Sequence, residues 1–205
     1  MNLKLRKLGM QDYRKTWASM QNVILSKGNE DPDELWLLEH FPVYTLGFGA
    51  SEDHLLTESN IPVIRSDRGG EVTYHGPGQI IAYFLINLRR KNWGPKRFVN
   101  ELEASVIDFL KKYNITSTRQ PGDPGIYVKG KKISSVGLKI KRGFSYHGLS
   151  INIDMDLSPF KNINVCGNKS LKVTHLNKFT EVSIDKAFKD FEKTAKDRFE
   201  GIMSR

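Results

Sequence analysis

The sequence predicts an α/β protein folded as one domain over residues 1–205. Some segments carry apolar residues at helical spacing. Between them lie short segments in which apolar and polar residues alternate, or in which apolar residues are consecutive, as in β-strands. No linker rich in proline, glycine or serine divides the chain, and 205 residues are enough for one substantial core. We therefore expect strands packed against helices in a single unit.

In the first half of the chain, strand signals surround one helix. In residues 1–8 apolar and polar side chains alternate, as in an edge strand. Residues 12–27 carry apolar side chains at helical spacing. Residues 80–88 are apolar almost throughout, the pattern of a central strand covered on both faces. Shorter strands are predicted at residues 34–39, 43–46 and 61–66.

The second half begins and ends with a helix. The first is predicted from Pro95 to about residue 113, because proline is acceptable in a first turn. The last begins after Ser183, a favourable N-cap, and ends near residue 202. Between the helices, strands are predicted at residues 115–119 and, as a three-stranded meander, at 125–129, 131–141 and 144–153.

The stretch R-G-G-E-V-T-Y-H-G-P-G-Q, residues 68–79, holds four of the chain's 17 glycines. Glycine pairs at both ends predict two sharp bends around a short extended segment, with exposed backbone N–H groups beside polar side chains. This composition suits a concave binding site, although a tight hairpin with ordinary loop polarity is the alternative. The glycines match neither a phosphate-binding loop nor a dinucleotide-binding fingerprint.

The middle strand of the meander places Lys132 on the same face as Val136 and Leu138, by simple alternation. A lysine there is partly desolvated, which favours a neutral amine, unless its stem carries the charge out to water. Gly137 and Gly148 leave the backbone open to close approach by a ligand and could form one wall of a slot. We interpret His147 as a structural histidine.

Cys166 is the only cysteine, so an internal disulfide is excluded and a cysteine-based metal site is not expected. A lone cysteine is most often a small buried hydrophobe. Cys166, however, stands in an irregular stretch between Asn164 and Asn168, a setting typical of reactive thiols on loops. Backbone N–H groups in 76–79 or at 166–167 are candidates to stabilise an oxyanion there.

The formal net charge of +9 predicts an acidic partner, which by charge alone could be a nucleic acid, a membrane surface or an acidic protein. The aromatic residues fall within the predicted core elements, which argues against a nucleic-acid-binding module. No apolar run has the length of a signal peptide or a membrane span, so we expect a cytoplasmic protein without a membrane partner. Much of the excess charge falls in the meander, where we interpret most of the lysines as a solvated strand face: Lys129, Lys131, Lys132, Lys139, Lys141 and Arg142.

Three separated motifs resemble one family, the octanoyltransferases of lipoate biosynthesis. They are the stretch 68–79, the segment G-K-K-I-S-S-V-G-L-K-I at 130–140, and H-G-L-S-I-N-I-D followed by D-L-S-P-F and N-V-C-G, ending at residue 167. Val165 departs from the family's usual proline before the cysteine. The resemblance implies a fold similar to the catalytic domains of biotin and lipoate ligases, with a mixed or largely antiparallel sheet flanked by helices.

The resemblance also implies a reaction. An octanoyl group would pass from octanoyl-acyl carrier protein to Cys166 and then, with Lys132 as catalytic partner, to a lysine ε-amine on a lipoyl domain. Such domains belong to 2-oxoacid dehydrogenase E2 subunits and the glycine cleavage H protein. No cofactor, metal or nucleic acid is implied, and the alternative is an ATP-dependent lipoate or biotin ligase, which needs no nucleophilic thiol. The implied acyl-slot residues are Arg68, Gly69, Gly70, Glu71, Val72, Thr73, Tyr74, His75, Ser135, Val136, Gly137, Gly148, Leu149 and Ser150.

Overall fold

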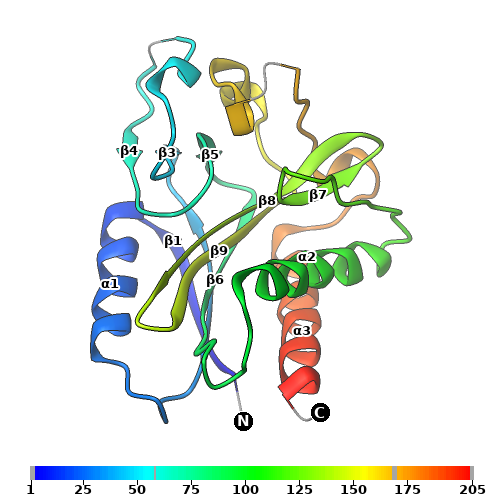
Figure 1. Cartoon of the computed structure of the whole chain (residues 1–205). Helices are drawn as coiled ribbons and strands as arrows, with labels where there is room; N and C mark the ends of the chain where they lie inside the picture. Colours follow the sequence, from blue (N-terminus) through cyan, green and yellow to red (C-terminus); the bar gives the residue numbers. More distant parts are fainter. Residues whose placement is uncertain (1–2, 58, 168–169, 204–205) are drawn as a thin grey trace.

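A computed structural model describes residues 3–57, 59–167 and 170–203, without the side chains of Cys166, Ile202 and Met203. Within those residues a six-stranded sheet has the order β1-β2-β6-β9-β8-β7 (Figure 1). Its first pair is parallel and the other pairs are antiparallel, which confirms the expected mixed, largely antiparallel sheet. The strands are β1 (Lys4–Gln11), β2 (Glu34–His40), β6 (Gln79–Leu85), β7 (Gly125–Val128), β8 (Lys131–Lys141) and β9 (Phe144–Asn152).

Helices cover both faces of this sheet. On one face lies α1 (Tyr13–Ser26), which begins where the Asp12 side chain accepts a hydrogen bond from the Lys15 N–H. On the other face lie α2 (Pro95–Lys111) and α3 (Ile184–Met203). In β6, Ile81, Tyr83 and Leu85 pack with the α1 cluster, whereas Ile80, Ala82 and Phe84 pack with α2 and α3. The continuous apolar run at 80–88 is thus a central strand buried on both faces, as predicted.

A smaller sheet stands at one end of the large one, with the order β4-β3-β5 (Figure 1). Its strands are β3 (Val43–Leu46), β4 (Val63–Arg65) and β5 (Thr73–His75). The 68–71 loop connects β4 to β5 beside the larger sheet. Short 3-10 turns occupy the same end: η1 (Glu52–His54), η2 (Ser158–Asn162), η3 (Val165–Gly167) and η4 (Leu176–Lys178).

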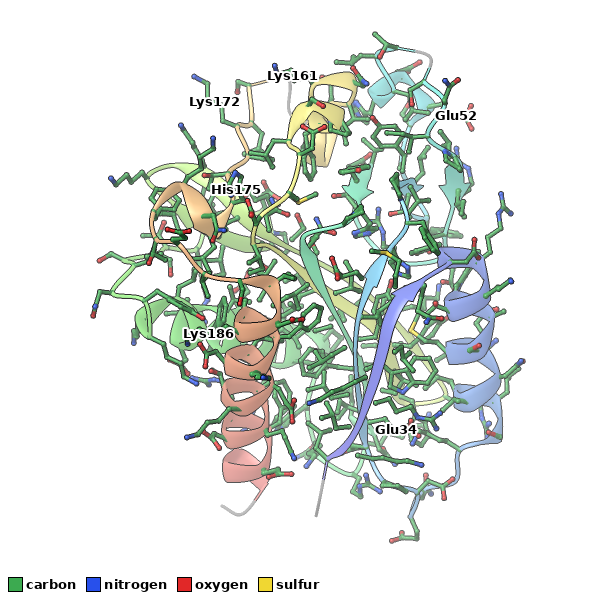
Figure 2. The ribbon with its side chains drawn as sticks, turned by 180° about the vertical axis from the view of Figure 1, so that it is seen from behind. Glu34, Glu52, Lys161, Lys172, His175 and Lys186 are labelled. Carbon is green, nitrogen blue, oxygen red and sulfur yellow. The ribbon has the colours of Figure 1, made fainter. Side chains whose placement is uncertain are left out.

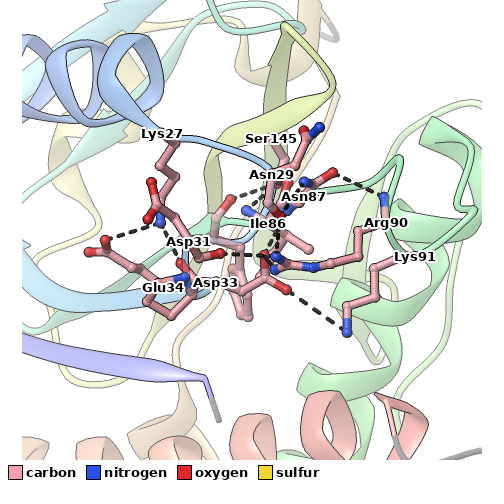
Figure 3. Close-up of polar contacts among 12 residues, drawn as sticks. Lys27, Asn29, Asp31, Asp33, Glu34, Ile86, Asn87, Arg90, Lys91 and Ser145 are labelled. Carbon is pink, nitrogen blue, oxygen red and sulfur yellow. Dashed lines mark hydrogen bonds and ion pairs between the residues drawn. The ribbon is translucent and has the colours of Figure 1, made fainter. Parts of the chain in front are cut away.

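A buried ionic cluster closes the opposite end of the molecule, around Asp33 (Figure 3). Asp33 accepts a hydrogen bond from the Asn87 N–H at 2.8 Å and pairs with Arg90 at 2.8 Å. Beside it, Lys27 pairs with Glu34 at 3.2 Å. Figure 2 shows Glu34 at this end and Glu52 at the other, so the cluster ties the loop before β2 to the loop after β6, far from the small sheet.

The strand predicted at residues 115–119 is wrong. Only Thr118 pairs, through two hydrogen bonds of 2.9 Å with Tyr127, as an isolated bridge. The residues around it are exposed or half-buried and, in the described part of the chain, add no further pairs to that bridge, so β-branched side chains alone do not make a strand of them. None of the helices in the described ranges is both long and apolar enough to cross a membrane.

The turn after β3 packs directly against the 68–71 loop. The Phe48 N–H donates to the Arg68 carbonyl at 2.8 Å, and a Cβ added to Gly47 would lie 1.7 Å from the Gly70 carbonyl oxygen. A side chain at position 47 would therefore push the loop away. Gly49, two residues later, has open space around its Cβ position.

We predict that Gly47→Ala lowers the free energy of unfolding by roughly 1–3 kcal/mol, the usual cost of overpacking. Gly49→Ala is the matched control and should stay close to the wild type. Urea denaturation of the three proteins measures both changes. Equal stability of Gly47→Ala and Gly49→Ala would contradict the close approach of the two loops.

Candidate active site

A cavity of about 710 Å³ lies between the 68–71 loop, strands β8 and β9, the loop at 122–124 and the start of α2. Lys132 lines it, together with most of the residues expected in an acyl slot. Those residues are Arg68, Gly69, Gly70, Glu71, Thr73, His75, Ser135, Val136, Gly137, Gly148, Leu149 and Ser150.

Val72 and Tyr74 are not among the lining residues. They alternate with Glu71, Thr73 and His75 along the chain, so their side chains point to the opposite side of β5. There both are buried in a separate cluster, and the Tyr74 ring contacts the rings of Tyr44 and Phe160. These two residues shape the small sheet from behind the cavity wall.

Arg68 holds the motif loop in place. Its guanidinium donates to the Thr45 carbonyl at 2.6 Å and to the carbonyls of Gly69 and Glu71 at 2.9 Å each. The side chain passes over β8 at Gly137, where an added Cβ would lie 3.1 Å from the Arg68 Cδ.

At the two glycines expected to allow close approach of a ligand, other parts of the protein make that close approach. Gly137 and Gly148 are cross-strand partners and both line the cavity. The space of the missing Cβ at Gly137 is occupied by Arg68, and that at Gly148 by the Ala82 carbonyl oxygen, 2.1 Å from an added Cβ. The reason for glycine at these positions is therefore the close approach of the loop and of β6.

Lys132 is 1% exposed, so its charge does not reach water along the surface. Its Nζ pairs with Asp123 Oδ1 at 2.5 Å and lies 5.5 Å from the centre of the Tyr127 ring. Tyr127 also donates its hydroxyl hydrogen to the same carboxylate. Gly125 gives the stem its room, since a Cβ there would lie 2.7 Å from the Lys132 Cε.

The predicted face of Lys132 is wrong because β7 and β8 shift register. Ile126 pairs with Ser134 whereas Tyr127 pairs with Lys132, so β8 carries an extra residue, Ile133. This bulge breaks the alternation, and Ile133, not Lys132, joins the main apolar cluster against which Val136 packs. Lys132 is buried instead by Gly125, Asp123 and Tyr127.

Cys166 belongs to the 3-10 turn η3, on a loop as predicted, and its side chain lies outside the described residues. The loop is fixed by its backbone, because the Asn164 N–H donates to the His54 carbonyl at 2.9 Å. The Gly167 N–H donates to the Asn164 carbonyl and the Gly78 N–H to Glu39 at 2.6 Å. Both groups already have acceptors, so these two N–H groups are not the oxyanion donors that the sequence suggested.

No sequence pattern singles out Asp67 or Asp123, because nothing local shows which side chain either carboxylate reaches. Asp67 accepts hydrogen bonds from Tyr146 and, at 2.9 Å, from His147 Nε2. Burial by itself would raise the pKa of Asp67, but these bonds hold it well below its usual range. Burial lowers the pKa of His147, which lines the cavity with a φ of +60°, so its ring stands as a neutral, fixed structural group.

Two more histidines form a buried polar layer next to the cavity. His40 Nε2 lies 2.7 Å from the Tyr83 hydroxyl, and His75 Nδ1 lies 2.8 Å from Gln79 Oε1. The His75 ring stacks on Tyr13. Burial lowers the pKa of His40 to about 4 and that of His75 to about 3, so both rings are neutral at pH 7.

Comparison with known proteins agrees with this architecture. A family model described as the lipoyl protein ligase A/B catalytic domain matches residues 12–198. The chain belongs to this family. It is 52% identical to the octanoyltransferase of Vibrio atlanticus over 175 residues, or 85% of this chain and 80% of that protein. It is 46% identical to that of Pseudomonas fluorescens over 187 residues, or 88% and 87% of the two chains.

Solved structures of the same fold include those of ligases. A lipoate-protein ligase A bound with ATP has a TM-score of 0.83 at 16% identity, covering 98% of this chain and 86% of that one. A biotin protein ligase from Aquifex aeolicus has a TM-score of 0.58 at 14% identity, covering 100% and 72%. At such identities the likeness shows the fold alone, and the expected ligase-like fold is confirmed. The octanoyltransferase relatives confirm the expectation of an acyltransferase.

The buried histidines predict acid sensitivity. Their folded pKa values lie below the unfolded value of about 6.5, so the unfolded state binds more protons and stability is lost as pH falls from there towards 4. At pH 5 each buried ring should lower the free energy of unfolding by about 2 kcal/mol relative to neutral pH. We predict that His40→Gln makes the free energy of unfolding less steep with pH, by about 1.2 kcal/mol per unit between pH 6 and 5.

Urea denaturation of His40→Gln and wild type across that range measures the slope. Between pH 7 and 8, where histidine is neutral in both states, the two slopes should coincide. Parallel curves between pH 6 and 5 would show that His40 is protonated in the folded protein.

Proposed function

We propose that the protein transfers an octanoyl group from octanoyl-acyl carrier protein, through a thioester on Cys166, to the ε-amine of a lysine on a lipoyl domain. The observation that carries this proposal is the buried Lys132, fixed by Asp123 in the wall of a cavity that the 68–71 loop also lines. A buried ion pair is weak evidence for a structural role, because apolar residues of similar volume in place of both partners often give equal or greater stability. The names and identities of the relatives support the same substrate.

The first half-reaction makes the acyl-enzyme. A thiol with an ordinary pKa near 8.5 is only a few per cent ionised at pH 7, and a nearby ammonium favours the thiolate. The Cys166 proton passes to the Lys132 amine, and the thiolate attacks the donor carbonyl. The carrier's thiolate then leaves and takes the proton back from Lys132. Cys166 is acylated and Lys132 is left as an amine.

The second half-reaction moves the acyl group from sulfur to nitrogen. The acceptor amine attacks the thioester carbonyl, the C–S bond breaks and Lys132 accepts a proton from the attacking nitrogen. An ammonium and a thiolate are restored together. Acyl transfer from a thioester to an amine is downhill, so this route uses no ATP.

The donor and the acceptor are proposed from charge and chemistry. Carrier proteins are generally acidic, and the exposed basic residues at the two ends of β8, Lys129 and Lys131 at one and Lys141 and Arg142 at the other, add positive charge that would speed their encounter. The acceptors would be the lipoyl domains of 2-oxoacid dehydrogenase E2 subunits and the glycine cleavage H protein. A free reactive thiol also favours the cytoplasm, where thiols stay reduced.

Mixing the protein with octanoyl-acyl carrier protein should add one octanoyl group to it, with no ATP present. Intact-mass measurement detects the adduct, and hydroxylamine should remove it because a thioester is labile to that nucleophile. Cys166→Ala should acquire no such adduct and should lose turnover. Full turnover by Cys166→Ala would refute the thioester mechanism, and a strict requirement for ATP would favour the ligase alternative.

Lys132→Arg should separate the two half-reactions. Arginine keeps a cation but stays protonated, so the thiolate and the acyl-enzyme should form while transfer to the acceptor slows by about 100-fold or more. The exposed neighbour provides a matched control, Lys131→Arg, which should transfer normally. Rapid-quench measurement of each half-reaction tests this, and normal transfer by Lys132→Arg would leave Lys132 with an electrostatic role only.

A further inference from the structure

His54 and Glu71 form a polar pair at the edge of the cavity that the mechanism above does not use. His54 is the last residue of η1, and Glu71 belongs to the loop that lines the cavity. Their Nε2 and Oε2 atoms are 3.7 Å apart, within ion-pair range but too far for a direct hydrogen bond. His54 Nδ1 and Glu71 Oε2 are both buried and have no hydrogen-bond partner among the described residues.

The pair lies against the loop of the proposed nucleophile. The His54 carbonyl accepts the Asn164 N–H at 2.9 Å, and the Leu56 N–H donates to the Asn162 carbonyl at 2.8 Å. A Cβ added to Gly167 would lie 3.2 Å from His54 Nε2 and 3.6 Å from Glu71 Cγ. The imidazole and the carboxylate are therefore adjacent to the residue that follows Cys166.

The proton count of the second half-reaction calls for a further base. A lysine side chain reaches the enzyme as an ammonium with three protons, and the amide nitrogen that it becomes keeps one. Lys132 can accept one of the two protons released. The carboxylate of Glu71 and the imidazole of His54 each have a buried polar atom without a partner among the described residues. A carboxylate can bind an ammonium, and an imidazole can accept the other proton.

We propose that Glu71 and His54 receive the ε-ammonium of the acceptor lysine, an inference that rests on the function proposed above. The Glu71 carboxylate attracts the ammonium, and His54 takes its first proton to become an imidazolium beside Glu71. The neutral amine then attacks the thioester carbonyl, the Cys166 thiolate leaves, and Lys132 takes the second proton. The atoms and charges balance without another reactant.

The charged groups around the pair agree with an ammonium as ligand. Glu52 and Asp53 precede His54 on the same turn, and Glu52 is paired with Arg65 at 2.9 Å. Arg65 neutralises the charge of Glu52, so Glu71, which lines the cavity, is the carboxylate that would attract a cation to the pair.

The test uses His54→Gln and Glu71→Gln in the full chain, each first converted to its octanoyl-enzyme. Two nucleophiles are compared in single turnover: a lipoyl domain, whose lysine arrives protonated, and hydroxylamine, which is already neutral at pH 7. The ratio of the two rates removes any effect of the substitution on acyl binding. We expect the ratio of lysine to hydroxylamine transfer to fall about 100-fold at pH 7 in both variants.

The pH profile gives a second readout. The neutral fraction of a free lysine rises tenfold per pH unit below its pKa of about 10.4, so the defect of both variants should shrink steadily between pH 7 and 9. Glu52→Gln removes a carboxylate from the same turn, at a site 76% exposed and paired with Arg65, and should leave the ratio unchanged. Figure 2 shows this residue on the outside of the molecule.

Each outcome is decisive. A wild-type ratio in both variants, or equal slowing towards both nucleophiles, overturns the proposal, since the second result means that the pair only supports the cysteine loop. Failure of the wild type itself to form an octanoyl-enzyme overturns the proposed function, and the role of His54 and Glu71 with it. A defect in Glu52→Gln equal to that in Glu71→Gln would assign the effect to general charge and also refute the pair.

Discussion

The candidate site depends on one buried guanidinium. Arg68 joins three parts of the molecule that are far apart in sequence: it donates to Thr45 in β3, to its own loop at Gly69 and Glu71, and it packs over Gly137 in β8. Hydrogen bonds from a charged donor are stronger than neutral ones, and a buried donor that lost them would be costly. The small sheet, the motif loop and the large sheet are thereby held as one wall of the cavity.

A second buried cation, Lys132, also lines the cavity, and the two cations are held differently. Arg68 is held mainly by backbone carbonyls and a hydroxyl, whereas Lys132 is held by a carboxylate. An amine on a flexible stem can exchange a proton, and a guanidinium cannot. The arginine therefore suits a fixed structural and binding role, and the lysine suits a chemical one. Removing Asp123 from the lysine would leave a buried charge uncompensated, at a cost of about 3–5 kcal/mol.

The cysteine loop is attached to this frame chiefly through backbone contacts. Val165 packs in the cluster of the small sheet, and Asn164 is bonded to His54. Valine replaces the proline usual before the cysteine, so burial of its side chain and the hydrogen bonds of its neighbours fix the turn in place of a rigid ring. The same contacts place His54 and Glu71 beside the loop of Cys166, the proposed nucleophile.

The sequence by itself determined the elements that local physics decides. Apolar periodicity predicted α1, α2, α3 and the meander, and the unbroken apolar run identified the central strand, because burial on two faces requires apolar side chains on both. Glycine density located the loop that lines the cavity, and three motifs identified the family. Each of these signals is formed by residues that are close together in the sequence, so it can be recognised without the structure.

Only the tertiary structure decided which residues distant in the sequence are in contact. The bulge at Ile133 depends on the pairing of β8 with β7, and it moved Lys132 off its predicted face. The segment 115–119 had strand propensity, but only Thr118 of it pairs, in an isolated bridge to Tyr127. Asp123 reaches Lys132, and His54 reaches Gly167, through loops whose course no local pattern specifies. Pairing register and loop approach are set by packing between distant residues, and that information enters only when the chain is folded.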